Sequence, residues 1–329
     1  SDVYKRQVRD GVTAEEVKGI LLGMASGQET LLGYFRRFIR NFEKRVGINR
    51  TVGSLRAYSN AYSHIERFLQ AQYKLSDIPF SALDRSFIDK YDLYLRTERN
   101  LAPGTIINLT VQLKTIVGEA IADGIITASP FMGYEPVRPK HVQKYLTAEE
   151  LHRIMTTPLH RQTLYHVRDM FLFSCFTGIP YGDMRLLTKD NLCLAEDGIW
   201  WIKSARQKTK IEFEIPLLDL PLQILKKYSG TAPGDKLLPM YCNSTLNLYL
   251  KEIARICHID RPLVFHAGRH TYATEITLSH GVPLETVSRM LGHSQIETTQ
   301  IYAKVTDEKI DADTKALNRK ISERFSVVI

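Results

Sequence analysis

The segment from residue 128 to residue 144 limits the possible folds of this chain more than any other part of the sequence. It contains three prolines and a glycine among basic residues, namely Pro130, Pro136, Pro139 and Gly133. Its apolar residues follow no regular period, so it offers no face to a packed core. Because 329 residues suffice for two cores of ordinary size, we expect two domains joined by a linker at residues 131–146.

The first domain is predicted to be a small helical bundle over residues 28–130. Residues 29–46 place six apolar side chains at helical spacing, with arginines between them: Leu31, Leu32, Phe35, Phe38, Ile39 and Phe42. Three similar patterns follow at about 53–72, 84–97 and 104–122. Residues 1–27 show only a weak helical pattern and are expected to be the remnant of a further domain in a chain whose natural start is missing.

The second domain is expected to span residues 147–329. Thr147 and Glu150 form the pattern of a capping box, which predicts a helix start immediately after the linker. Residues 199–203 and 210–215 predict two strands joined by a polar turn, because apolar and charged residues alternate in the second of them. The remainder is helical in pattern, so the fold class is mainly α with a small β hairpin or sheet.

Positive charge is concentrated in the first domain. The net charge is +8, and between Arg36 and Arg56 seven basic residues face only Glu43 as an acid. A polyanion such as DNA fits this pattern, and a solvated helix face fits it equally well from charge alone. Five of these residues are the candidates for phosphate contacts: Arg36, Arg37, Arg40, Lys44 and Arg56.

Other features exclude several classes of protein. No run of ~18 apolar residues predicts a membrane span, and no apolar leader opens the chain, so a cytoplasmic protein is expected. The cysteines lack any C-x-x-C pair, which argues against a zinc ribbon or a disulfide framework and favours reduced packing residues. They are Cys175, Cys193, Cys242 and Cys257.

The sequence HAGRH at residues 266–270 is the first candidate for chemistry. It places His266, Arg269 and His270 on one helical face. A zinc protease would need glutamate at position 267, where Ala267 stands, so no metal site is expected. An arginine beside a histidine suits a phosphate better. A polar helix face that merely meets solvent is an equal alternative for this motif alone.

The sequence LGHSQIETTQIYAKV at residues 291–305 is the second candidate. On one continuous helix His293 and Tyr302 would lie on opposite faces, ~13 Å apart along the axis. Gly292 is a natural helix stop, however, and Ser294 with Glu297 predicts a capping box for a new helix that carries Tyr302. A site between the two helices is then possible, although a core tyrosine with an incidental histidine explains the isolated spacing better.

Lys208 completes the set of candidates, in the turn between the two predicted strands. It is either a mobile cation that reaches a site or a solvated hairpin lysine.

Taken in order, a hairpin lysine, H-x-x-R, L-G-H and a tyrosine nine residues later resemble the catalytic domain of the tyrosine recombinases. Residues 28–130 are similar to the helical SAM-like core-binding domain of that family, and 147–329 to its mixed α+β catalytic domain. Residues 1–27 would then be the possible remnant of an N-terminal arm-binding domain.

The resemblance implies a site-specific recombinase, most similar to the integrases of conjugative transposons and temperate phages. Tyr302 would attack a DNA phosphate, release a 5′-hydroxyl and form a 3′-phosphotyrosine. Arg269 would hold the phosphate oxygens, Lys208 would protonate the leaving oxygen, and two histidines, His266 and His293, would serve proton transfer and hydrogen bonding. No cofactor, metal or ATP is implied.

The resemblance also implies partners. These are double-stranded DNA, a homotetramer assembled on two duplexes and accessory DNA-bending proteins, with no membrane. The expected role is integration and excision of a mobile element.

One departure from the family pattern concerns the phosphate clamp. The family has T-G-L-R followed by an acid three positions later, whereas here Pro180 takes the place of the arginine and Asp183 matches the acid. Loss of such a cation could cost ~3 kcal/mol, roughly a hundredfold in rate. Arg185 projects ~140° around a helix from that position and so is a weak candidate to replace it, and a basic residue from elsewhere is equally possible. The alternative is a DNA-binding homologue with weakened catalysis.

Overall fold

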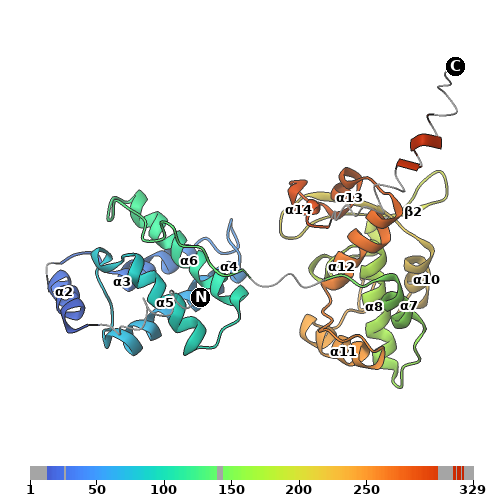
Figure 1. Ribbon diagram of the computed structural model, residues 1–329. Coiled ribbons are helices and arrows are strands. Elements are labelled where there is room, and N and C mark those ends of the chain that lie inside the picture. The colour runs from blue at the N-terminus through green and yellow to red at the C-terminus, as the bar shows by residue number, and fades with distance from the viewer. Residues whose placement is uncertain are drawn as a thin grey trace, which may run out of the picture. The chain divides into compact units, whose positions relative to one another are not determined.

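The computed structural model describes residues 13–25, 27–138 and 144–302, with short pieces at 314–315, 317–319 and 321. The chain divides into two compact units, Ser1–His141 and Val142–Ile329 (Figure 1). The start of the expected remnant at residues 1–27, part of the expected linker and most of the tail beyond Tyr302 lie outside the described residues. The predicted fold class, mainly helical with one small sheet, is confirmed.

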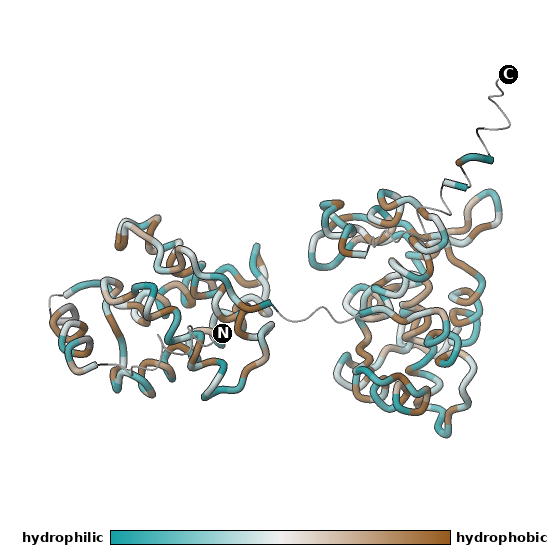
Figure 2. The backbone as a smooth tube through the Cα atoms, in the orientation of Figure 1, coloured by the Kyte–Doolittle hydropathy of each residue, from teal (hydrophilic) through white to brown (hydrophobic). Residues whose placement is uncertain are grey.

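The first unit is helical in the part that the structure describes. Its elements are α2 (Ala14–Ala25), α3 (Leu31–Glu43), α4 (Val52–Phe68), a π-helical turn (Leu69–Tyr73), a 3-10 turn (Phe80–Ala82), α5 (Arg85–Thr97) and α6 (Pro103–Ala122). The four predicted helices correspond to α3, α4, α5 and α6, and the second of them ends as the π-helical turn. Figure 2 shows apolar and polar residues alternating along these helices, as amphipathic helices require. Their apolar faces meet in a core centred on Phe35, Phe68 and Tyr91.

The N-terminus of α3 is capped from a distant part of the chain. Thr30 precedes the helix but makes no side-chain cap bond. Instead, the Asp77 carboxylate accepts hydrogen bonds from the backbone N–H groups of Leu32 at 2.8 Å and Gly33 at 3.0 Å. A carboxylate at this end also interacts favourably with the helix dipole. The basic helix is therefore anchored through its first turn by a single acid.

Replacing Asp77 with alanine should destabilise the first unit by about 1–3 kcal/mol, because two partly buried N–H groups lose a charged acceptor. Denaturant unfolding followed by circular dichroism measures the change. Thr30→Ala is the matched control and should leave stability almost unchanged. Equal losses in the two variants would contradict the capping role of Asp77.

The second unit combines helices with a three-stranded sheet. Its helices are α7 (Ala148–Thr156), α8 (Gln162–Thr177), α9 (Tyr181–Met184), α10 (Asp219–Lys227), α11 (Asn243–Ile256), α12 (Ala267–Thr271), α13 (Leu284–Leu291) and α14 (Glu297–Gln300). Shorter turns are Lys189–Asn191, Tyr272–Thr277 and Leu278–His280. Helix α8 packs against other helices of the unit, because α7, α10, α11 and α12 all contact it (Figure 1). The buried α8 is thus the centre of this unit.

The sheet is antiparallel with strand order β1, β2, β3. The strands are β1 (Leu192–Leu194), β2 (Trp200–Ala205) and β3 (Glu212–Pro216). The predicted hairpin corresponds to β2 and β3, in which Ile202 pairs with Ile215 and both are buried. The sequence did not predict β1, because three half-exposed residues are too few to show a period.

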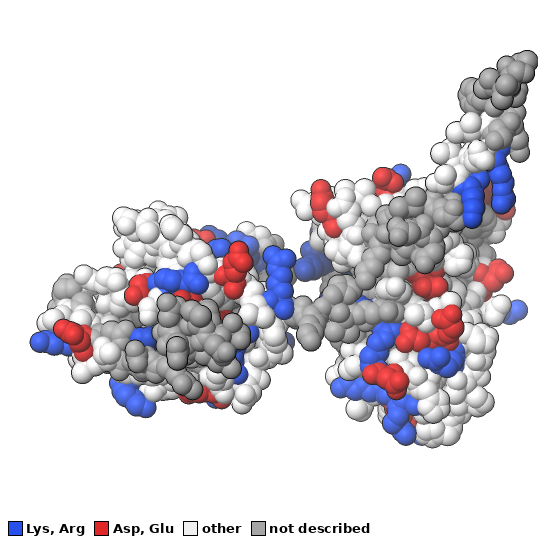
Figure 3. Space-filling view, viewed as in Figure 1, with Lys and Arg blue, Asp and Glu red and all other residues white. Residues whose placement is uncertain are grey.

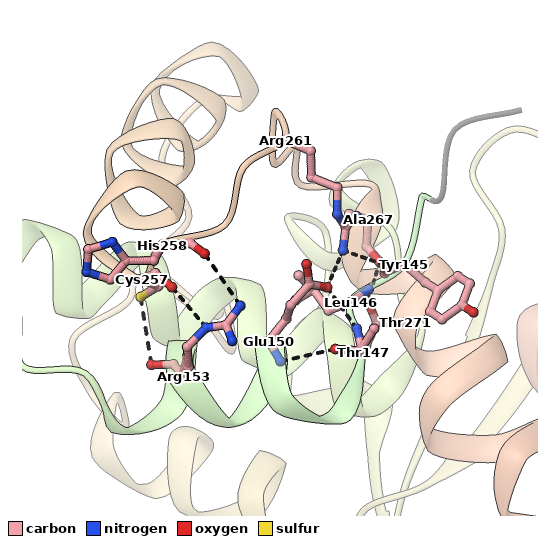
Figure 4. Close-up of polar contacts among 10 residues, drawn as sticks. All are labelled: Tyr145, Leu146, Thr147, Glu150, Arg153, Cys257, His258, Arg261, Ala267 and Thr271. Atoms are coloured by element: carbon pink, nitrogen blue, oxygen red, sulfur yellow. Dashed lines mark hydrogen bonds and ion pairs between the residues drawn. The ribbon is translucent and has the colours of Figure 1, made fainter. Parts of the chain in front are cut away.

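The predicted capping box at the start of α7 is confirmed (Figure 4). The Thr147 hydroxyl accepts from the Glu150 backbone N–H, and the Glu150 carboxylate accepts from the Thr147 backbone N–H. Arg261 donates to the same carboxylate and to the Tyr145 carbonyl. The first turn of the second unit is therefore tied to the chain just before α12.

A second set of hydrogen bonds in Figure 4 involves α12 itself. The Thr271 hydroxyl accepts from the Leu146 N–H at 2.9 Å and donates to the Ala267 carbonyl at 2.9 Å. Thr271 is fully buried, so α12 is fixed against the start of the unit at an interior position.

The cysteines are all free thiols. Cys175 and Cys257 are buried and Cys193 is half-buried, as packing residues would be, but Cys242 is exposed. The expectation of a packing role is therefore wrong for Cys242, because its position before α11 leaves it at the surface.

None of the helices in the described ranges combines the length and the apolar character needed to cross a membrane.

Candidate active site

Arg269 is the buried centre of the candidate site. It lies on the short helix α12, beside α8, and only 3% of it is exposed. Its guanidinium donates to the carbonyl of Gly178 at 2.9 Å and to the carbonyl of Leu291 at 2.7 Å. Burial first, and the nearby Arg206 second, lower its pKa to about 10. Arg269 therefore remains a cation near neutral pH.

Position 178, whose carbonyl accepts from Arg269, requires a glycine. It ends α8 in the left-handed conformation, with φ of 70°. A Cβ there would lie 2.5 Å from Cδ1 of Tyr272 and 2.9 Å from Cδ2 of Leu291. Both conformation and space thus demand glycine.

His293 contacts Arg269 because α13 ends just before it, at Leu291. Gly292 ends α13 with φ of 63°, which confirms the predicted helix stop. Nε2 of His293 accepts from Nη2 of Arg269 at 2.8 Å, since arginine can only donate. The proton of the neutral ring is then on Nδ1, which donates to the hydroxyl of the buried Thr299 at 2.7 Å. Burial first, and the two arginines second, lower the His293 pKa to about 4.

The predicted capping box at Ser294 is wrong. α14 begins at Glu297 after Ile296 and has no side-chain cap, because the chain first turns through the residues after Gly292. Tyr302 consequently lies in the turn just beyond this four-residue helix rather than on it. Its backbone N–H donates to the Thr299 carbonyl at 3.0 Å.

Tyr302 is nonetheless held inside the site. It is 9% exposed, and its ring lies 6.5 Å from that of His293 and 5.3 Å from that of His270. Burial raises the pKa of its hydroxyl, whereas the charges of Arg269 and Arg206 and a hydrogen bond with Arg269 lower it. The two cations thus reduce the cost of removing the phenolic proton.

The structure brings together four of the five predicted catalytic residues. His266 immediately precedes α12, with its ring 4.7 Å from that of His270. Its pKa is lowered, first by burial of the ring and then by Arg269. Lys208 is exposed in the turn between β2 and β3, and no contact within the described residues joins it to Tyr302 or Arg269.

Several residues of the site were not predicted. Arg206 opens the same turn as Lys208, forms an ion pair with Asp183 at 2.6 Å and donates to the Leu291 carbonyl at 2.8 Å. Thr299 fixes the tautomer of His293. No sequence signal distinguishes Arg206 from the other cations of its turn, because both of its partners are distant in sequence.

The candidate DNA-contacting residues of the first unit are exposed. Arg36 donates to the Tyr62 hydroxyl at 2.5 Å, and Arg37 pairs with Glu29 at 3.0 Å. The remaining three extend along α3 and the start of α4: Arg40, Lys44 and Arg56. Figure 3 shows that acidic side chains are interspersed with basic ones on the face drawn.

No group of three or more histidines, cysteines or acids has the arrangement of a metal site in the portion of the chain that the structure covers.

Two family models match the sequence. The model of the phage integrase family matches residues 144–309, and that of the phage integrase SAM-like domain matches residues 30–136. The chain belongs to the phage integrase family. It is a tyrosine-type site-specific recombinase.

The recombinase has related sequences in several bacteria. It is 25% identical to tyrosine recombinase XerD of Listeria monocytogenes over 273 residues, which cover 78% of this chain and 89% of that protein. It is 26% identical to XerD of Staphylococcus saprophyticus, over 86% of this chain and 96% of that protein.

Solved structures share its fold. The Tn1549 transposon integrase in complex with transposon right end DNA matches with a TM-score of 0.67 at 19% identity, over 88% of this chain and all of that one. A lambda integrase dimer bound to a core site matches with a TM-score of 0.68 at 18% identity, over 85% and 100% of the two chains.

Three histidines of the recombinase should make its stability depend on pH. The pKa values of His270 and His293 fall from 6.5 to about 4 on folding, and that of His266 also falls. The unfolded state therefore binds more protons than the folded state between these values. The free energy of unfolding should decrease as the pH is lowered from about 6.5 towards 4, as denaturant unfolding at a series of pH values would measure.

Replacing both His270 and His293 with asparagine should make this decrease shallower. A decrease that stays as steep as in the unaltered recombinase would contradict the assignment.

Proposed function

We propose that the recombinase cleaves and rejoins DNA through a covalent bond between Tyr302 and a 3′-phosphate. The observation that carries this proposal is the contact of the buried Arg269 with both Tyr302 and His293. A buried, permanently charged guanidinium beside a tyrosine hydroxyl suits a reaction in which negative charge develops on a phosphate.

In the proposed cleavage step the phenolic oxygen of Tyr302 forms a bond to phosphorus as the bond to the 5′-oxygen breaks. Arg269 holds the nonbridging oxygens, and His266 and His293 provide hydrogen bonds and proton transfer. The 5′-oxygen leaves as a hydroxyl with a proton from Lys208, whose exposed hairpin turn suits a group that meets DNA. One phosphodiester replaces another, so a 5′-hydroxyl from a second duplex can rejoin the strand without ATP.

A protein that binds DNA without catalysis is not the function we propose. Such a protein would have no need to bury Arg269 against His293 and Tyr302, because burial of an arginine is unfavourable unless its donors are satisfied.

We further propose that residues 28–130 bind the core DNA site and residues 147–329 carry out catalysis, with 131–146 as the linker between them and 1–27 as part of an arm-binding domain. Five basic residues of the first unit would contact phosphates: Arg36, Arg37, Arg40, Lys44 and Arg56. The proposed activity belongs in the cytoplasm, with the DNA.

A role in integrating and excising a mobile element is supported by the likeness to the Tn1549 transposon integrase and to lambda integrase. A lambda integrase tetramer is known bound to a Holliday junction, with a TM-score of 0.67 to this chain. We propose the same assembly, four protomers on two duplexes with accessory DNA-bending proteins, for this recombinase.

Replacing Tyr302 with phenylalanine should abolish the covalent adduct and leave DNA binding intact. The assay uses a nicked duplex whose core sequence is selected from a random library by binding to the full chain. Cleavage next to the nick releases a short 5′-hydroxyl fragment, so the adduct accumulates and appears on a denaturing gel.

Tyr272→Phe is the matched control, because Tyr272 is buried in the same apolar cluster but donates its hydroxyl to the sulfur of Met290. It should form the adduct normally. An unaltered chain that binds the selected duplex specifically and forms no adduct would refute the proposed function.

Replacing Arg40 with alanine should weaken DNA binding and reduce the slope of log K against log salt by about 0.9, the contribution of one phosphate contact. Glu43→Gln, which neutralises the one acid of this basic stretch, should strengthen binding. Fluorescence anisotropy over a range of salt concentrations measures both slopes. Weaker binding by both variants would indicate damage to α3 rather than loss of a phosphate contact.

A further inference from the structure

The phosphate clamp lacks the arginine that the family pattern places at position 180. We propose that Arg206 is a catalytic residue that binds the scissile phosphate together with Arg269 and so replaces that missing cation. This inference rests on the proposed function.

Arg206 and Arg269 converge on one acceptor. The carbonyl oxygen of Leu291 accepts from Nη1 of Arg206 at 2.8 Å and from Nη2 of Arg269 at 2.7 Å. The two donating nitrogens therefore lie no farther apart than these two bonds together. A pair of guanidiniums at this spacing can hold two nonbridging oxygens of one phosphodiester.

The charge of Arg206 also shifts the pKa values of neighbouring groups in the site. It lowers the pKa of the Tyr302 hydroxyl, of the His293 ring and of Arg269 itself. A cation that acts on both the nucleophile and the neighbouring histidine is placed where charge would develop during attack.

Asp183 holds Arg206 in this position. The carboxylate is 6% exposed, and one oxygen pairs with Nε of Arg206 at 2.6 Å while the other accepts from the Gln207 backbone N–H at 2.9 Å. The side-chain stem rests on Gly292, where an added Cβ would lie 2.9 Å from Cγ of Arg206. Nη2 makes no hydrogen bond within the described residues, so this nitrogen is available to a ligand.

The position of Pro180 explains how the replacement is built. Pro180 precedes α9, and its carbonyl accepts from the backbone N–H groups of Asp183 and Met184. The acid that follows the expected arginine in the family pattern thus holds the cation that substitutes for it. Arg185 does not compete, because it is exposed and lies over the Tyr181 ring, 6.0 Å from its centroid.

The test must separate a phosphate contact from a purely structural tie between Asp183 and Leu291. We would measure single-turnover cleavage of the selected nicked duplex with oxygen, and with sulfur in place of either nonbridging oxygen, at the scissile phosphate. A sulfur that faces Arg206 weakens its contact, so one sulfur diastereomer should be cleaved more slowly than the oxygen duplex. In Arg206→Ala cleavage of the oxygen duplex should fall by roughly a hundredfold, and the extra penalty of that diastereomer should disappear.

Three further variants serve as controls for this measurement. Arg206→Lys keeps the charge but loses the planar fork, so it should retain part of the rate. Arg185→Ala is the matched arginine control and should keep both the rate and the sulfur effects. If Arg206→Ala lowers the melting temperature, Arg206→Ala is also made in an Asp183→Asn background and compared with Asp183→Asn alone, because the double variant lacks the unpaired buried carboxylate.

The outcomes separate this inference from the function on which it rests. If the unaltered chain forms no adduct at Tyr302, the proposed function fails. If it does, and Arg206→Ala either cleaves within about threefold of the unaltered rate or keeps unchanged sulfur effects, the role of Arg206 is overturned while the function stands.

Discussion

The burial of Arg269 is the constraint on which the rest of the site depends. A guanidinium that is 3% exposed destabilises the fold unless its donors are satisfied. Here the acceptors are carbonyls at the C-terminal ends of two helices, Gly178 after α8 and Leu291 at the end of α13. Such carbonyls lack partners within their own helices and carry partial negative charge. One cation therefore stabilises two helix ends and fixes them relative to α12.

This arrangement determines where the other groups lie. Both helix ends turn through left-handed glycines, and the chain beyond Gly292 brings His293 back to Arg269. Because arginine only donates, His293 must accept through Nε2 and donate through Nδ1 to Thr299. The carbonyl of Thr299 in turn accepts a hydrogen bond from the backbone N–H of Tyr302. The tyrosine is thus positioned by a chain of hydrogen bonds that starts at the buried arginine and passes through Thr299 of α14.

The sequence predicted those features of the second unit that depend on interactions between residues close together in the chain. The capping box at Thr147 and the stop at Gly292 involve residues a few positions apart, and both are confirmed. The supposed cap at Ser294 failed because it depends on the direction in which the chain leaves Gly292, which packing decides. Arg206 was missed for a related reason, since its partners Asp183 and Leu291 are 23 and 85 residues away.

The charge balance of the site suits a phosphodiester. Arg206 and Arg269 supply two permanent positive charges, and Asp183 offsets only one of them. The excess positive charge adds to burial in keeping His293 and His266 neutral, because it disfavours their protonated forms. A bound phosphodiester contributes one negative charge and would remove that excess. The pKa values of the two histidines would then rise, which in the proposed mechanism favours proton uptake when DNA occupies the site.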